Sequence, residues 1–199
     1  MQFGTFVPQG WRLDLVQVEG DLNKYRAMKE CALRAERAGY DSIWLYDHFH
    51  TVPDAELEAC FEVWTATAAL AEATSRVRLG QMCGCNIYRP PALLAKITAN
   101  IDVISNGRLD VGLGAGWYEH ETVAYGYSFE KPAVRIGQLD EAAQILSNQL
   151  SYGLWGLYST AMQVAGLISG SDRRLSPQGS KLVAEMVACM GDAEWQSFH

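Results

Sequence analysis

Short β-rich runs alternate with longer amphipathic runs over the first three quarters of the chain. Their starts lie about 35 residues apart, enough for one strand, one loop and one covering helix. Consecutive right-handed units of this kind form a parallel sheet. The pattern therefore predicts four strand–helix units, and it fits both an open doubly wound sheet and a closed barrel. The predicted strands are Phe3–Val7, Ser42–Tyr46, Val77–Met82 and Leu109–Leu113.

The intervening runs repeat apolar residues every three or four positions, which is typical of helices packed on a sheet. Gly39 and Gly107 stand where helix C-caps belong, and Pro90 and Pro91 suit a first helical turn. The predicted helices cover Asn23–Ala38, Glu58–Ala73, a segment from Pro90–Pro91 to Gly107, and Ala133–Leu146.

The character of the chain changes after residue 146. The stretch Leu150–Ile168 is apolar but interrupted by glycines, which favours a buried helix over a membrane span. Ser176–Pro177 then resembles the start of a further amphipathic helix. We expect two regions, residues 1–146 and a mostly helical tail of residues 147–199.

Composition narrows the class of protein. A formal net charge of -7 argues against a nucleic-acid partner, which would need a basic face. Met1 leads directly into an apolar strand pattern without the features of a signal peptide. The five cysteines are scattered and odd in number, which favours reduced thiols. We expect a cytoplasmic protein with no membrane anchor and no metal site.

In α/β barrels, the loops that follow the strands build the active site. Three such loops have unusual residues: Asp47–Phe49, Cys83–Asn86 and Gly114–Glu119. His48 is the natural acid–base residue, because imidazole titrates near neutral pH. Asp47 could orient this imidazole or bind a ligand. The alternative is that Asp47 caps a turn and His48 packs beside Phe49.

Glycines and cysteines mark the ends of the third and fourth strands. Gly112-x-Gly114-x-Gly116 lacks the spacing of a dinucleotide fingerprint and follows the wrong strand for one. Glycines here would let a flat ring approach the backbone, or they would relieve crowding between strand ends. Small residues at Cys83–Cys85 favour a ligand platform. No basic residue lies close in sequence to activate a thiol.

Together these segments resemble the luciferase-like oxidoreductases, the bacterial luciferase superfamily of flavin- and deazaflavin-dependent enzymes. The resemblance covers about Met1–Leu146. Its most specific part is Gly112–Glu121 followed by Tyr125–Gly126. The other segments that carry it are Ala38–Trp44, Asp47–Phe49, Val77–Gly80 and Ile104–Leu109.

The resemblance implies a (β/α)8 TIM barrel and hydride transfer with FMN or the deazaflavin coenzyme F-420, with the deazaflavin branch the better match. The family carries a non-prolyl cis peptide that supports the flavin ring at the end of strand three. His48 would be the proton donor. The cofactor contacts implied by position are Asp47, Met82, Cys83, Gly84, Gly114, Ala115, Gly116, Trp117 and Tyr118.

A complete barrel of this kind needs about 250 residues. We therefore expect a partial barrel of four strand–helix units plus the tail, acting on a small-molecule substrate as a homodimer, with activity impaired by the missing half. The alternative is a non-catalytic flavin-binding module, or an inert fragment stabilised by self-association.

Overall fold

The computed structural model describes residues 1–146, 168–169, 174–175, 177 and 181. The chain divides into two parts, Met1–Leu146 and Ser147–His199. In the second part β7 (Ile168–Ser169) pairs antiparallel with β8 (Arg174–Leu175), a pairing that we did not predict. The remainder of the predicted helical tail lies outside the described residues.

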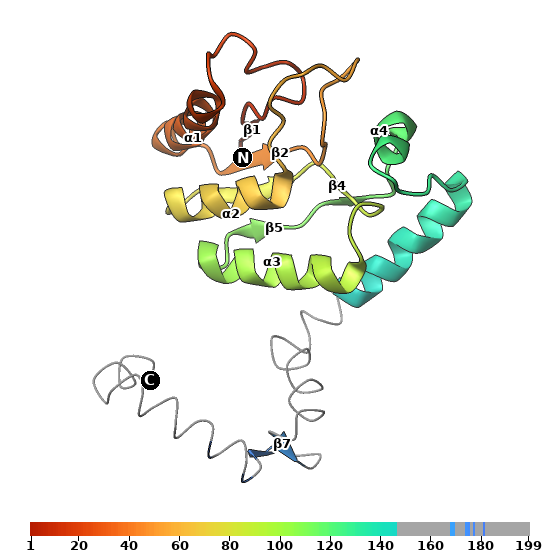
Figure 1. Ribbon diagram of the computed structural model, residues 1–199. Helices are drawn as coiled ribbons and strands as arrows, with labels where there is room; N and C mark the ends of the chain where they lie inside the picture. Colours follow the sequence, from red (N-terminus) through yellow and green to blue (C-terminus); the bar gives the residue numbers. More distant parts are fainter. Residues whose placement is uncertain (147–167, 170–173, 176, 178–180, 182–199) are drawn as a thin grey trace. The chain divides into compact units, whose positions relative to one another are not determined.

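Four parallel strands form the sheet of the first part (Figure 1). They are β1 (Gly4–Phe6), β2 (Ser42–Leu45), β3 (Arg78–Gln81) and β5 (Leu109–Asp110), in the spatial order β1-β2-β3-β5. Each strand is added beside its predecessor. A doubly wound sheet reverses direction at a switch point, whereas a barrel continues in one direction. The order therefore agrees with a partial barrel.

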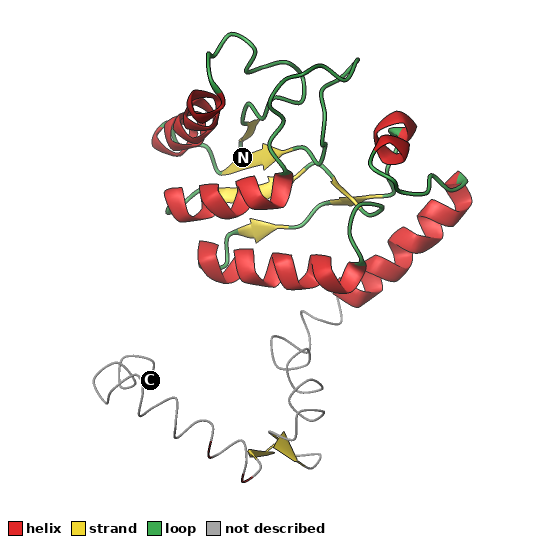
Figure 2. Ribbon diagram, viewed as in Figure 1, coloured by secondary structure: helices red, strands yellow, loops and turns green. Residues whose placement is uncertain are grey.

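Three helices connect these strands: α1 (Asp21–Arg37), α2 (Val63–Ala73) and α3 (Pro91–Ser105) (Figure 2). Successive helices contact each other, α1 with α2 and α2 with α3. The apolar core lies between helices and sheet, and each fully buried Leu or Ile side chain contributes about 1.5–3 kcal/mol. Its members include Met28, Ala32, Ile43, Leu45, Leu70, Val77, Leu79, Leu94 and Ile101.

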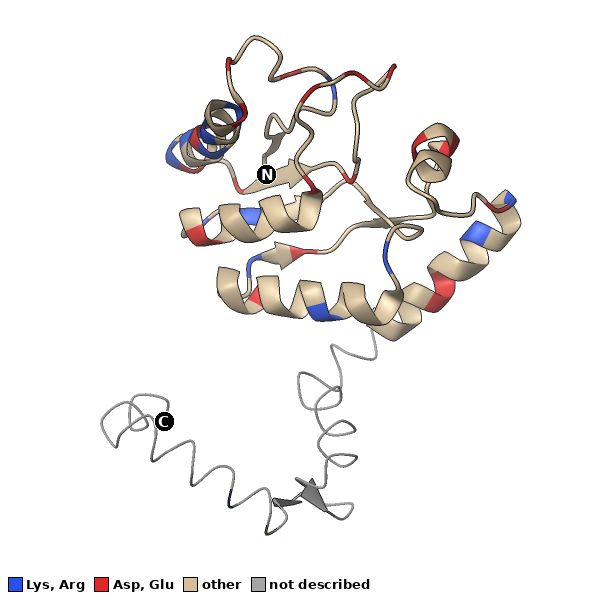
Figure 3. Cartoon of the chain, in the orientation of Figure 1, with Lys and Arg blue, Asp and Glu red and all other residues tan. Residues whose placement is uncertain are grey.

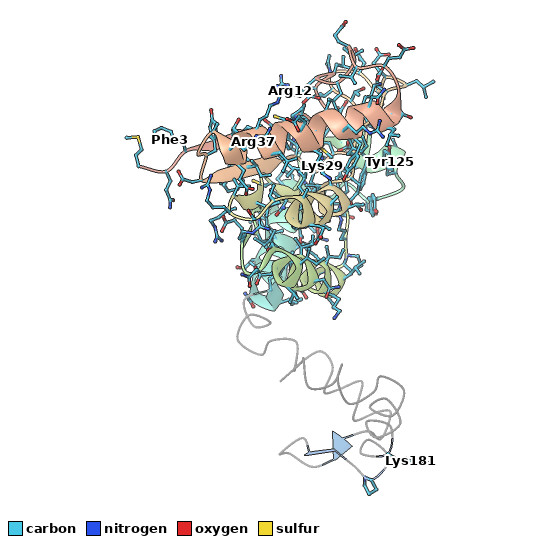
Figure 4. All side chains as sticks on the ribbon, turned by 90° about the vertical axis from the view of Figure 1, so that its left-hand side faces the viewer. Phe3, Arg12, Lys29, Arg37, Tyr125 and Lys181 are labelled. Atoms are coloured by element: carbon cyan, nitrogen blue, oxygen red, sulfur yellow. The ribbon has the colours of Figure 1, made fainter. Side chains whose placement is uncertain are left out.

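A short helix and a longer one follow the sheet strands. α4 (Glu119–Ala124) comes directly after the fourth unit's strand end, and a further helix covers residues 132–146. Figure 4 shows Phe3, next to the start of β1, and Tyr125, next to α4, at opposite ends of this part of the molecule. α4 therefore lies at the end where the strands terminate. Within the described part of the chain, no helix is long and apolar enough to cross a membrane.

The second helix begins five residues later than predicted. The carboxylate of Glu62 accepts hydrogen bonds from the backbone N–H of Trp64 (3.1 Å) and Thr65 (2.7 Å), so Glu62 is the N-cap. Just before it, the N–H of Phe61 donates to the carbonyl of Gln9 at 3.0 Å. The prediction that the helix starts at Glu58 was wrong, because these contacts hold residues 58–62 as a loop.

The predicted fourth strand is divided into β5 and β6 (Leu113–Gly114), and β6 pairs in parallel with β4 (Gly84–Cys85). Gly112 lies at the break. A Cβ atom on Gly112 would lie 2.2 Å from the carbonyl oxygen of Gln81, which no real side chain tolerates. Crowding between strand ends, one of the two interpretations of these glycines, therefore holds at Gly112.

Charged residues of both signs lie on α1 (Figure 3), and one of them ties this helix to the sheet. The Glu36 carboxylate accepts backbone N–H bonds from Arg76 (2.7 Å) and Val77 (2.8 Å), directly before β3. Burial acts to raise the pKa of Glu36, but the bonds from Val77, Arg76 and Ser75 outweigh it, so the pKa is lowered.

Glu36→Gln is expected to lower the free energy of unfolding by about 1 kcal/mol at neutral pH, because hydrogen bonds to a charged acceptor are stronger. A lowered pKa stabilises the fold fully above the ordinary value of about 4.3, and this stabilisation disappears as the pH falls through the folded value. Urea denaturation at pH 7 and in acid should show the gap closing. A gap of equal size at both pH values would contradict the prediction.

Candidate functional site

The three loops singled out in the sequence meet at the carboxyl ends of the strands. The Gly84 N–H donates to the Gly112 carbonyl at 2.8 Å, and the Asn86 N–H donates to the Gly114 carbonyl at 3.0 Å. These bonds join the segment after β3 to the segment after β5. Glu121 of α4 and Arg89 connect the third loop, Asp47–Phe49, to these two segments.

His48 is bound by a buried glutamate from α4. Its Nδ1 lies 2.8 Å from Oε2 of Glu121, and the side chain of Glu121 has no exposed surface. The same Oε2 accepts the Tyr88 hydroxyl at 2.5 Å. Oε1 accepts the backbone N–H groups of Phe49 (2.7 Å) and His50 (3.1 Å). Burial opposes ionisation, but the bonds from His48, Tyr88 and Phe49 outweigh it and lower the pKa of Glu121.

Aromatic rings surround the His48 imidazole. It stacks on Trp11 with ring centroids 4.1 Å apart and nearly parallel planes. The ring centroids of Trp11 and Tyr46 are 4.4 Å apart, and Tyr46 stacks on Phe6 with centroids 4.5 Å apart. The rings of Trp117 and His48 are steeply inclined to each other, at 73°, with centroids 6.0 Å apart. His48 is thus held in a defined ring plane beside a row of flat apolar surfaces.

Asp47 binds an arginine rather than His48. Arg89 donates to both carboxylate oxygens, at 2.6 Å and 3.0 Å, and the Cys85 N–H donates at 2.7 Å. Arg89 also donates to Glu62, the N-cap of α2, at 2.5 Å. Burial raises the pKa of Asp47, while Arg89 and the Cys85 N–H oppose that rise. The orientation of His48, which Asp47 could have supplied, comes from Glu121, and cofactor contact by Asp47 stays a prediction.

The residues predicted to contact the cofactor are partly exposed. The Met82–Cys83 peptide is cis, in the position that the family resemblance indicated. Met82 is 47% exposed and Cys83 is exposed as well, whereas Gly84 is buried. A Cβ on Gly114 would lie 3.3 Å from the Cβ of Cys83. Around this contact, the segment with Cys83 and Gly84 and the segment with Gly114 therefore carry only backbone and small side chains.

The remaining predicted cofactor contacts, Ala115–Tyr118, follow β6. Ala115 and Tyr118 are partly exposed, and Trp117 is 63% exposed. Gly116 has a positive φ of 78°, and a Cβ there would lie 2.5 Å from Ile87, so glycine is required. Cofactor binding by these residues stays a prediction.

Three further observations define the chemistry available. Burial raises the pKa of Cys85 to about 11, so this thiol is not a nucleophile at neutral pH. Trp11 Nε1 and Asn86 Oδ1 are buried without a hydrogen-bond partner among the described residues, which leaves a donor and an acceptor for water or a bound group. The described residues contain no group of three metal-ligating side chains.

Sequence reasoning missed Glu121, Tyr88, Arg89 and Trp11. Glu121 stood within the Gly112–Glu121 motif, but only as part of the family resemblance. Arg89 and Asp47 are 42 positions apart, and a separation of this kind carries no periodic signal. If Asp47 is buried, however, its carboxylate requires a cationic or N–H partner. This requirement was the one hint in the sequence that a residue such as Arg89 must lie nearby.

Comparison with known proteins agrees with this arrangement. The family model described as luciferase-like monooxygenase matches residues 1–170. An F420-dependent glucose-6-phosphate dehydrogenase of Amycolatopsis mediterranei is 32% identical, over 61% of this chain and 36% of its own length. A pyrimidine monooxygenase, RutA, of Methylorubrum extorquens is 29% identical, over 97% of this chain and 52% of its own length.

A solved structure shares the fold. It is the oxygenating constituent of 3,6-diketocamphane monooxygenase from Pseudomonas putida, a type II Baeyer-Villiger monooxygenase in complex with FMN. It aligns with a TM-score of 0.59 and 20% identity, over 73% of this chain and 38% of its own. The chain thus spans from about a third to a half of the length of these proteins. With a family model matched over most of its length, the chain belongs to the luciferase-like monooxygenase family.

Proposed function

We propose that this chain binds a deazaflavin, coenzyme F-420, or FMN, and takes part in hydride transfer to or from a small-molecule substrate. The observation that carries the proposal is the position of His48. It is held by Glu121 at the carboxyl end of a parallel sheet, the end from which the exposed Met82–Cys83 segment, Gly114 and Gly116 also come. A relative named as F420-dependent and a structure with FMN support the choice of cofactor class.

The residues present fit a flat ring. Gly114 leaves space that a side chain would fill against Cys83, and Met82 and Trp117 expose apolar surface at the same end of the sheet. Exposed apolar surface next to bare backbone is typical of sites for aromatic ligands. Cys83, Gly84 and Gly114–Tyr118 would hold the cofactor, with Trp11 Nε1 and Asn86 Oδ1 as unsatisfied polar groups nearby in the chain's loops.

When bound, the cofactor supplies the hydride donor or acceptor. The protein must then manage a proton on the substrate. His48 is suited to this because Glu121 occupies Nδ1 and leaves Nε2 for proton exchange. The stacked Trp11 and the nearby Trp117 fix the plane of the imidazole, and so the direction in which Nε2 points.

Titration with F-420 and with FMN, followed by fluorescence quenching, tests the proposal. We expect saturable binding of one of them, weakened about tenfold or more by Gly114→Val, which corresponds to about 1.4 kcal/mol. Gly137→Ala is the matched control, because a Cβ at Gly137 meets no atom within 4 Å. Failure of both cofactors to bind would refute the proposal.

A second measurement separates catalysis from binding alone. The protein loaded with F-420 is given glucose 6-phosphate, and the protein loaded with reduced FMN and oxygen is given uracil, the probes suggested by the two named relatives. Loss of probe that depends on His48 supports an oxidoreductase. Tight cofactor binding with no loss of either probe would instead indicate a non-catalytic flavin-binding module.

A further inference from the structure

We infer that Glu121 is a positioning residue that fixes the tautomer of His48, with the proton on Nδ1 and the lone pair on Nε2. The structural part of this inference stands on the contacts of Glu121. Its catalytic consequence rests on the proposed function, in which Nε2 exchanges a proton with the substrate.

The partners of Glu121 require it to be an acceptor. Both backbone N–H groups on Oε1, from Phe49 and His50, can only donate. The Tyr88 hydroxyl on Oε2 is buried with the carboxylate, and burial raises the pKa of Tyr88, so this group also donates. An ionised carboxylate has no proton to give, so the His48 nitrogen at 2.8 Å must carry the hydrogen.

The two carboxylate oxygens of Glu121 have different partners, and this difference predicts what an amide would do at the same position. In Glu121→Gln the amide has one oxygen and one NH2 group. The oxygen must remain opposite the N–H groups of Phe49 and His50, because an NH2 group there would face two donors. The NH2 group then replaces Oε2 and donates to Nδ1 of His48. An isosteric change would therefore move the imidazole proton from Nδ1 to Nε2.

The stack of His48 on Trp11 keeps the ring plane while this happens. The two rings are 4.1 Å apart and inclined by only 4°. The site thus loses its free lone pair without losing the imidazole. A merely structural role for Glu121 would predict lower stability and an unchanged tautomer.

The experiment is nitrogen NMR of the histidine side chains, recorded at a pH where imidazoles are neutral, with the His48 signal assigned by its disappearance in His48→Asn. We expect the Nδ1–H form in the wild type and the Nε2–H form in Glu121→Gln. Glu119→Gln, an exposed neighbour on α4, is the matched control and should leave the wild-type form. Tyr88→Phe removes one donor to Oε2 and should also keep the Nδ1–H form.

The kinetic readout is a split between kcat and KM. In the direction of substrate oxidation, Glu121→Gln should lower kcat on the order of 10²-fold or more, since a histidine with its proton on Nε2 cannot accept one there, with KM and cofactor affinity little changed. An Nε2–H form in the wild type would overturn the inference, even if Glu121→Gln fails to fold. So would an Nδ1–H form that persists in a folded Glu121→Gln. A tautomer change without turnover by the wild type would uphold the positioning role and refute the proposed function instead.

Discussion

Replacing Arg89 with leucine is expected to lower the free energy of unfolding by about 3–5 kcal/mol, because it leaves a buried carboxylate without its cation. The side chain of Asp47 has no exposed surface, and Arg89 is 10% exposed. Arg89 supplies two of the three hydrogen bonds that Asp47 receives, and a further one to Glu62. Urea denaturation at neutral pH measures the loss.

Two variants make this prediction specific. Arg89→Lys keeps the charge but cannot bind both oxygens of Asp47 as a planar fork, so it should lose an intermediate amount of stability. Arg34→Ala breaks an exposed pair with Glu30 on α1 and should cost less than about 1 kcal/mol. If Arg89→Leu also lost less than about 1 kcal/mol, the bonds of Arg89 to Asp47 and Glu62 would not be required for stability.

Replacing His48 with asparagine is expected to slow hydride transfer by about 10²- to 10⁴-fold, the usual contribution of a general acid or base. The measurement is a single-turnover rate with the cofactor-loaded protein and the probe that the wild type converts. Asparagine retains a group that can bond to Glu121, so the loops it joins should stay in place.

His120→Asn is the matched control for His48→Asn. His120 is an exposed histidine on α4, and its Nδ1 lies 3.4 Å from Nε2 of His50 rather than near Glu121. Its loss should leave the single-turnover rate within a few-fold of the wild type, because it exchanges no proton in the proposed reaction. Equal rate losses in both variants would remove His48 from its proposed role.

The scaffold was predictable because its signals are local. Short β-rich runs indicated the strands, helical periodicity indicated the helices, and Pro90–Pro91 and Gly107 bounded α3 closely. The error at the start of α2 came from relying on the local pattern alone. The run from Glu58 continues an apolar stripe, and only the contact of Phe61 with Gln9, far away in the chain, shows that it is a loop.

The site was predictable only in part. Residue types at strand ends indicated His48 and the glycines, since strand-end loops share one face of a parallel sheet. The partners that give these residues their chemistry come from elsewhere. Glu121 is 73 positions from His48, and Trp11 comes from a loop after β1 that has no unusual composition. Such pairings depend on three-dimensional packing and have no spacing rule.

The sequential strand order has a consequence for how the molecule forms. Each strand pairs with the one before it, so the sheet can grow one unit at a time, closing only short loops as the chain emerges from the ribosome. The carboxylate of Glu121 gathers Phe49, His50 and Tyr88, which belong to units already made. α4 follows all of these residues in the chain, so the contacts that hold His48 form only after the segments that carry Phe49, His50 and Tyr88 are in place.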